Sequence, residues 1–193
     1  HSVASVCTWD RQQLLAKIAG SFSIVPLNIL SADIFTRGDH TVLDIFRVCD
    51  TKGRAVTDQR DLALVEKALH SALEDENFDF APLMEKARHQ LHHRRAQEVE
   101  FPTTIAVDNK AHPAYTLIQI ETPDRLGLLY DLLSCLGREG VNIVLSRINT
   151  QKGAAIDTFY VTDSAARGKI TDSHRIAALQ RHLQAAALNA VAL

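Results

Sequence analysis

The sequence predicts an α+β protein built from two tandem copies of one strand–helix–strand–strand–helix unit, with an extra helix between the copies. Two observations lead to this prediction. The segment TWDRQQLLAKIAGSF, residues 8–22, returns in altered form 114 residues later as TPDRLGLLYDLLSCL. Further along, DIFRVCD and DTFYVTD repeat with a spacing of 113 residues. Self-similarity at a nearly constant spacing is typical of a duplicated structural unit.

The change of spacing by one residue falls between Thr150 and Asp157, where QKG takes the place of RGDH. A one-residue slip inside a strand would exchange its two faces, whereas a turn tolerates it. We therefore place a hairpin turn at this point in each copy.

A strand should open each copy, because SVASVCT and YTLIQIE, residues 2–8 and 115–121, are short runs rich in β-branched or aromatic side chains. A helix should follow, since apolar residues recur with a helical period from Leu14 in the first copy and from Leu128 in the second.

Two aspartates, Asp10 and Asp124, are expected to cap these helices, with Gln13 as a capping-box partner in the first copy only. Pro26 and Gly140 should end the helices. The turn before each helix would then present free backbone N–H groups and the positive end of the helix dipole to solvent or to a ligand.

A strand hairpin is expected next in each copy, across residues 28–49 and 142–162, and a second helix across residues 58–76 and 172–187. The run TTIAVDN, residues 103–109, is the expected fourth strand of the first copy. The terminal LNAVAL is the candidate in the second copy, although it would equally extend the helix. The predicted boundaries are 1–80 for the first domain, 81–100 for the linker helix and 113–193 for the second domain.

The composition is that of a globular protein, with 46% hydrophobic residues, 23% charged residues and a formal net charge of −2. This balance argues against a general electrostatic affinity for nucleic acid or anionic membranes. No apolar run approaches the roughly 20 residues of a membrane helix. We expect a cytoplasmic protein, and the strand at residue 1 suggests a piece of a longer chain.

The three cysteines, Cys7, Cys49 and Cys135, have no metal-ligand spacing and are expected to be reduced residues of the core. In antiparallel first and third strands, Cys7 and Cys49 would lie several residues apart at about 3.4 Å each, too far for a disulfide.

The two loops resemble the ligand loop of the ACT domain family, an Asp-Arg-Pro-Gly-Leu run followed by Asn-Ile at the next strand. The ordered set from VCTWDR to GKITD is similar to the C-terminal tandem of bacterial PII uridylyltransferase/uridylyl-removing enzymes and covers essentially all 193 residues. The resemblance implies two ferredoxin-like βαββαβ ACT domains with antiparallel sheets, helices on one face, and a homodimer through those sheets.

The same resemblance implies a regulatory role. Enzymes of this kind attach uridylyl groups to the PII signal protein with magnesium and remove them again, and their ACT pair senses glutamine. The implied partners are glutamine, the catalytic domains of a parent chain and PII, in nitrogen signalling. The sequence contains neither catalytic signature, so we expect no catalytic residue, metal or cofactor in this chain. A stand-alone tandem ACT protein stays open as the alternative.

The resemblance carries ligand-binding residues onto both loops and the strands that follow. The second copy lacks the family's Pro but keeps its Gly, where a ligand can approach the loop amides, whereas a glutamine stands there in the first copy. We expect the second copy to hold the stronger site, with Asn142 beside Gly127. The candidate residues are Asp10, Arg11, Gln13, Asn28 and Ile29 in the first copy, and Asp124, Arg125, Leu126, Gly127, Leu128, Asn142 and Ile143 in the second.

Plainer interpretations stay open beside these. The two aspartates would serve as simple caps, the arginines as solvated side chains and the asparagines as turn formers. HQLHHRR, residues 89–95, offers a two-ligand metal site or, more simply, a solvated helix face. An RNA-binding sheet would need stacking aromatics on its central strands, and an acylphosphatase a glycine-rich phosphate loop, and the sequence favours neither.

Overall fold

The computed structural model describes residues 1–188 except 12, 26, 38, 40, 92–100 and 152. Its strands form one continuous seven-stranded sheet in the order β1-β3-β2-β6-β7-β5-β4. The strands are β1 (Ser2–Trp9), β2 (Leu27–Thr36), β3 (Thr41–Asp50), β4 (Thr104–Asp108), β5 (Thr116–Pro123), β6 (Val141–Gln151) and β7 (Ala154–Asp163). The helices are α1 (Leu14–Ser23), α2 (Gln59–Glu74), α3 (Ala81–Leu91), α4 (Leu128–Arg138) and α5 (Ser173–Ala187).

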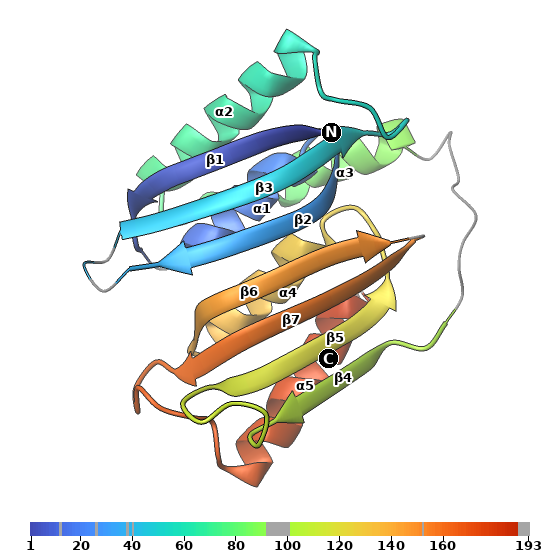
Figure 1. Cartoon of the computed structure of the whole chain (residues 1–193). Coiled ribbons are helices and arrows are strands. Elements are labelled where there is room, and N and C mark those ends of the chain that lie inside the picture. Colours follow the sequence, from blue (N-terminus) through green and yellow to red (C-terminus); the bar gives the residue numbers. More distant parts are fainter. Residues whose placement is uncertain are drawn as a thin grey trace.

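Every neighbouring pair of strands is antiparallel. Helices α1, α4 and α5 lie behind the sheet in Figure 1, and α2 packs beside α1. The predicted α+β class, with antiparallel strands and helices gathered on one face, is confirmed. The core lies between these layers and is centred on the fully buried Ile18, Phe46, Leu132 and Phe159.

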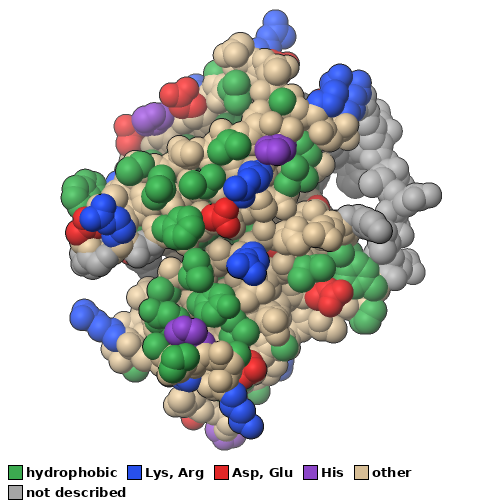
Figure 2. All heavy atoms as spheres, viewed as in Figure 1, with side chains coloured by type: hydrophobic (Ala, Val, Ile, Leu, Met, Phe, Trp, Pro, Cys, Tyr) green, Lys and Arg blue, Asp and Glu red, His purple; other side chains and the backbone are tan. Residues whose placement is uncertain are grey.

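The opposite face of the sheet has no helix over it among the described residues, and Figure 2 shows this face. Hydrophobic side chains gather on it among polar ones. Phe35 faces Leu43 on one side and Leu145 on the other in the strand register, and all three side chains are exposed. The alternation of buried and exposed residues along β3 and β7 follows from having one covered and one open face.

The two repeats are related by a pseudo-two-fold axis through the pairing of β2 with β6. In that antiparallel register, Asp33 lies opposite Arg147, which is its own equivalent 114 residues later. The bulges also match, at Ile29/Ser31 in β2 and Ile143/Leu145 in β6. A self-complementary contact of this kind brings the same surface of each repeat to the same interface. Residues from both repeats therefore meet at each end of the axis.

The prediction that residues 103–109 complete the first repeat is wrong. Strand β4 pairs with β5, with Thr104 opposite Glu121 and Asp108 opposite Leu117. Few residues separate β4 from β5, so their pairing closes a short loop, whereas pairing with β1 would close a loop of about a hundred residues. Within the described residues the first repeat has three strands, and its β1 is the outer edge of the sheet. Of the candidate terminal strand, residues 189–193 lie outside the described residues.

The second helices agree closely with their predicted ranges, and an aspartate caps each one. The side chain of Asp58 accepts a hydrogen bond from the backbone N–H of Arg60, and that of Asp172 from the N–H of Arg175. None of the described helices is long and apolar enough to span a membrane.

The cysteines are free, as predicted, and Cys49 and Cys135 are buried. The expected core position of Cys7 is wrong, because its side chain lies on the exposed side of the edge strand β1. Cys7 lies opposite Leu43 on β3, whereas Cys49 stands six residues further along that strand, opposite Asn28 on β2. Six residues of strand span about 20 Å, so the two thiols cannot join.

Candidate functional site

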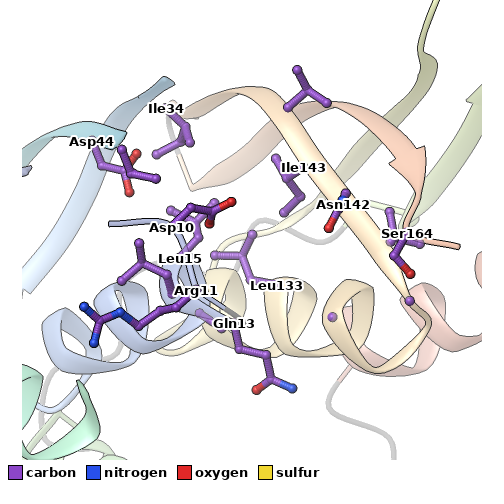
Figure 3. Close-up of a pocket in the computed structure, with 17 residues that line it drawn as sticks. Asp10, Arg11, Gln13, Leu15, Ile34, Asp44, Leu133, Asn142, Ile143 and Ser164 are labelled. Atoms are coloured by element: carbon purple, nitrogen blue, oxygen red, sulfur yellow. The ribbon is translucent and has the colours of Figure 1, made fainter. Parts of the chain in front are cut away.

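A pocket of about 560 Å³ lies between the two repeats. The first repeat contributes Asp10, Arg11 and Gln13 from the loop between β1 and α1, and the second contributes Asn142 and Ile143 from the start of β6. Figure 3 shows the loop facing β6 across the pocket, with the Asp10 side chain directed toward that strand. Five of the predicted ligand residues therefore come together, but from different repeats.

The loop reaches the pocket through a left-handed turn. Helix α1 starts at Leu14, and the residue before it, Gln13, has a φ of 56° with no capping hydrogen bond from its side chain. The matching residue before α4 is Gly127, with a φ of 79°. The prediction of Asp10 and Asp124 as helix caps is therefore wrong, since each stands before this turn, several residues short of its helix. Gln13 is not a capping-box partner either.

Gln13 extends toward the other repeat. A Cβ atom placed on Gly137, near the end of α4, would lie 3.1 Å from Cγ of Gln13, so this side chain packs against the glycine. In Figure 3 the Gln13 side chain points away from Asp10. Arg11 is exposed, and its Nη2 donates to Oγ1 of Thr8 at 3.3 Å. The rim of the pocket is thus polar and open to a ligand.

One wall of the pocket holds a buried carboxyl group, that of Asp44 on β3, a residue with a relative exposure of 1%. Burial, with a smaller effect of the nearby negative charge of Asp10, raises the pKa of Asp44 to about 7 against the opposing effect of the Phe35 backbone N–H, which lies near the carboxyl group. That N–H does not reach hydrogen-bond geometry, and neither carboxyl oxygen has another partner within the described part of the chain.

The loop of the second repeat is tied down within its own unit. Nη2 of Arg125 lies 2.6 Å from Oδ2 of Asp131, and it also donates to the carbonyl oxygen of Ala186 at 2.6 Å, at the end of α5. The Nε atom donates to the carbonyl of Ala187 at 3.1 Å. A cation at the C-terminal end of a helix is a favourable arrangement. This arginine is therefore already engaged.

The expected position of Asn142 beside Gly127 is wrong. The two residues stand at opposite ends of α4, an 11-residue helix about 16 Å long. Asn28 is separated from Gln13 by α1 in the same way. Each asparagine therefore lies at the far end of its own repeat's helix, and Asn142 shares a pocket with the first loop. The remaining candidates do not line this pocket: Asn28, Ile29, Asp124, Arg125, Leu126, Gly127 and Leu128.

Asp44, Ile34 and Ser164 line the pocket although sequence reasoning did not select them. A signal for Asp44 was present in the repeat itself, because an aspartate interrupts the apolar alternation of the same strand in both copies, at Asp44 and Asp157. The histidines His92 and His93 of the other proposed cluster lie outside the described residues. No group of three or more His, Cys, Asp or Glu residues gathers within the ranges that the structure covers.

Comparisons with known proteins agree with this architecture. Residues 104–193 match the family described as "ACR9-like, ACT-like domain", a range that begins at β4. The chain is 34% identical over 185 residues to the bifunctional uridylyltransferase/uridylyl-removing enzyme of Gluconobacter oxydans, and 32% identical over 183 residues to that of Rhodospirillum rubrum. Each alignment covers 94% of this chain and 19% of the relative.

The predicted resemblance is therefore confirmed: an ACT-like domain occupies residues 104–193, and nearly the whole chain is similar to part of these enzymes. The chain spans about a fifth of the length of the curated relatives that it matches. A solved structure of an unknown protein from Galdieria sulphuraria aligns with 93% of this chain and 89% of its own length at 20% identity, with a TM-score of 0.30.

Proposed function

We propose that this chain is a regulatory module that binds a free amino acid, glutamine first among them, in the pocket between its two repeats. The observation that carries the proposal is the meeting of the Asp10–Gln13 loop with Asn142 across that pocket. Its volume falls in the range of small-molecule sites. Acidic, basic and amide side chains around one pocket suit a ligand that carries both charges and an amide of its own.

The relatives suggest what such a module would regulate. They carry the name of a bifunctional uridylyltransferase/uridylyl-removing enzyme, and this chain corresponds to about a fifth of their length. We propose that the chain acts within a longer protein of that kind, which attaches uridylyl groups to the protein PII and removes them. Glutamine would shift the balance of these two activities toward removal. Magnesium, by the same resemblance, would belong to the catalytic part.

A ligand in this pocket would act through both repeats at once. Its contacts would join the loop after β1 to the start of β6, on either side of the β2–β6 pair. A ligand shifts an equilibrium only by its differential affinity for the two states, and one that contacts both repeats has more affinity for the arrangement that brings them together. Glutamine would therefore stabilise this arrangement of the tandem.

Thermal unfolding of the chain with and without amino acids tests the proposal. Glutamine at 100 times its dissociation constant should stabilise the fold by about 2.7 kcal/mol. Glutamate and asparagine serve as controls, since each changes one feature of the ligand, the end group or the length. If no amino acid at millimolar concentration shifts the transition, the proposed function is wrong for this chain.

A further inference from the structure

One wall of the pocket presents a buried acidic group that accepts no hydrogen bond from the described residues. Asp44 is 1% exposed and lies in the middle of β3, and none of the described residues hydrogen-bonds its carboxyl oxygens. Figure 3 shows its side chain on the wall of the pocket above the loop that carries Asp10. A buried polar group without a hydrogen bond is costly, so most are satisfied, and an exception calls for an explanation.

The second repeat shows what this position looks like when the protein satisfies it. Asp157 is the equivalent of Asp44, with a relative exposure of 2%, and its Oδ1 accepts a hydrogen bond from the backbone N–H of Asn149 at 3.3 Å. It does not line the pocket. The equivalent N–H in the first repeat belongs to Phe35, which lies near Asp44 and opposes the rise of its pKa without reaching hydrogen-bond geometry. The same donor therefore closes a hydrogen bond to Asp157 in the second repeat and falls short of one to Asp44 beside the pocket.

The charges around Asp44 favour a cation. The loop contributes Asp10, which adds a second carboxylate, and Arg11, which is exposed and engaged with Thr8. The described residues that line the pocket from α1, β2, α4 and β6 are all uncharged. Two carboxyl groups without a third metal-type ligand beside them suit an ammonium group, which offers three hydrogen-bond donors and a positive charge.

We propose that Asp44 binds the α-ammonium group of the ligand, with Asp10 beside it, and that the pocket therefore selects amino acids with a free amino group. This inference rests on the proposed function, because it names the group by which the same site recognises its ligand. The carboxylate of the ligand would face the Arg11 side of the loop. Its side chain would extend along β6, where Asn142 offers an amide.

Binding would then be coupled to a proton. In the empty pocket, the pKa of Asp44 is raised to about 7, so the carboxyl group is mostly protonated below neutral pH. An adjacent ammonium group favours the ionised carboxylate and lowers that pKa, so the ligand displaces the proton. The affinity should therefore be highest above pH 7 and fall by up to about tenfold per pH unit below it.

Calorimetry with glutamine tests this, using the full chain, Asp44→Asn and, as the matched control, Asp157→Asn. At pH 8 we expect Asp44→Asn to bind glutamine at least tenfold more weakly and Asp157→Asn to bind like the wild type. The wild-type chain should also bind N-acetylglutamine at least tenfold more weakly than glutamine, and this measurement does not depend on a folded variant. Its glutamine affinity should be several-fold lower at pH 6 than at pH 8.

The outcomes separate the two proposals. If the wild type binds glutamine but Asp44→Asn binds it equally well, or if N-acetylglutamine binds as tightly as glutamine, Asp44 does not bind the ammonium group and the proposed function stands. If the wild type binds no amino acid, both the proposed function and this inference are overturned.

Discussion

At the scale of single residues, the pair of buried aspartates gives the stability of this protein an unusual pH dependence. Burial raises the pKa of Asp157 to about 7, with a smaller contribution from the charge of Asp124, and the pKa of Asp44 is raised to the same region. An unfolded aspartate has a pKa of about 3.9. Between pH 4 and pH 7 the folded chain holds protons that the unfolded chain has lost, so stability falls as the pH rises through this window.

We therefore predict a lower free energy of unfolding at pH 8 than at pH 5, with a loss of up to about 1.4 kcal/mol per pH unit for each of the two aspartates until the pH passes about 7. The variant Asp157→Asn keeps an acceptor for the N–H of Asn149 but carries no charge, so it should lose part of this pH dependence. Urea unfolding of both chains at the two pH values measures the difference. The same slope in variant and wild type would show that Asp157 does not titrate as described.

The predicted helix caps were wrong because a capping aspartate and a left-handed turn are alternative ways to begin a helix. An aspartate before an apolar helix predicts a cap, but the chain inserts a left-handed turn at Gln13 and Gly127 first. Only the glycine hinted at a positive φ, and Gln13 adopts one although it carries a Cβ. That Asp44 lines a pocket could not be predicted for another reason. The other residues of the pocket come from both repeats, and no local sequence pattern shows which of them lie together.

At the scale of the elements, helix α1 depends on a glycine where it meets the linker. A Cβ atom on Gly20 would lie 2.9 Å from Cδ2 and Cε2 of Phe80. That ring is fully buried and packs edge-on against Phe78 and Tyr130, at centroid distances of 4.8 and 5.4 Å. Phe78 and Tyr130 therefore restrict the Phe80 ring, so it cannot move away from an added Cβ atom on Gly20 without disturbing them.

Replacing Gly20 with alanine should destabilise the protein by about 1–3 kcal/mol, the usual cost of overpacking a core. This reverses the ordinary preference of a helix for alanine, which is worth about 1 kcal/mol. The matched control is Gly137→Ala in α4, where the nearest atoms belong to the flexible side chain of Gln13. Denaturant unfolding of the two variants decides the point, and a Gly20→Ala chain as stable as the wild type would contradict the packing argument.

Hydrophobic periodicity predicted most elements, because each of α1, α4 and the two hairpins has a face that its own sequence defines. Strand β4 shows the limit of that reasoning. The run TIAVD was recognisable as a strand, but its partner depends on the cost of closing a loop and on which edge of the sheet is open. Hydrophobic periodicity contains no information on loop closure or on which sheet edge is open, so β4 was predicted to belong to the wrong repeat.

At the scale of the whole molecule, the pairing of β2 with β6 makes one sheet from two repeats and determines which residues can form a site. The duplication was readable in the sequence, whereas the register that places Asp33 opposite Arg147 was not. That register brings the loop of the first repeat to the start of β6 in the second, so the predicted ligand residues combine across repeats. That the second copy holds the stronger site stays a prediction, and the engagement of Arg125 with Asp131 and Ala186 argues against it in favour of the first loop.

The central claim is that the ligand site is shared between the repeats, and calorimetry with glutamine on Asn142→Ala and Asn28→Ala tests it most directly. The two asparagines are equivalent by the repeat, but only Asn142 lines the pocket with Asp10. We predict one glutamine bound per chain, with the affinity reduced about three- to tenfold by Asn142→Ala, the value of one neutral hydrogen bond, and unchanged by Asn28→Ala. Two equal sites per chain, or a loss of affinity with Asn28→Ala alone, would contradict a shared site at this pocket.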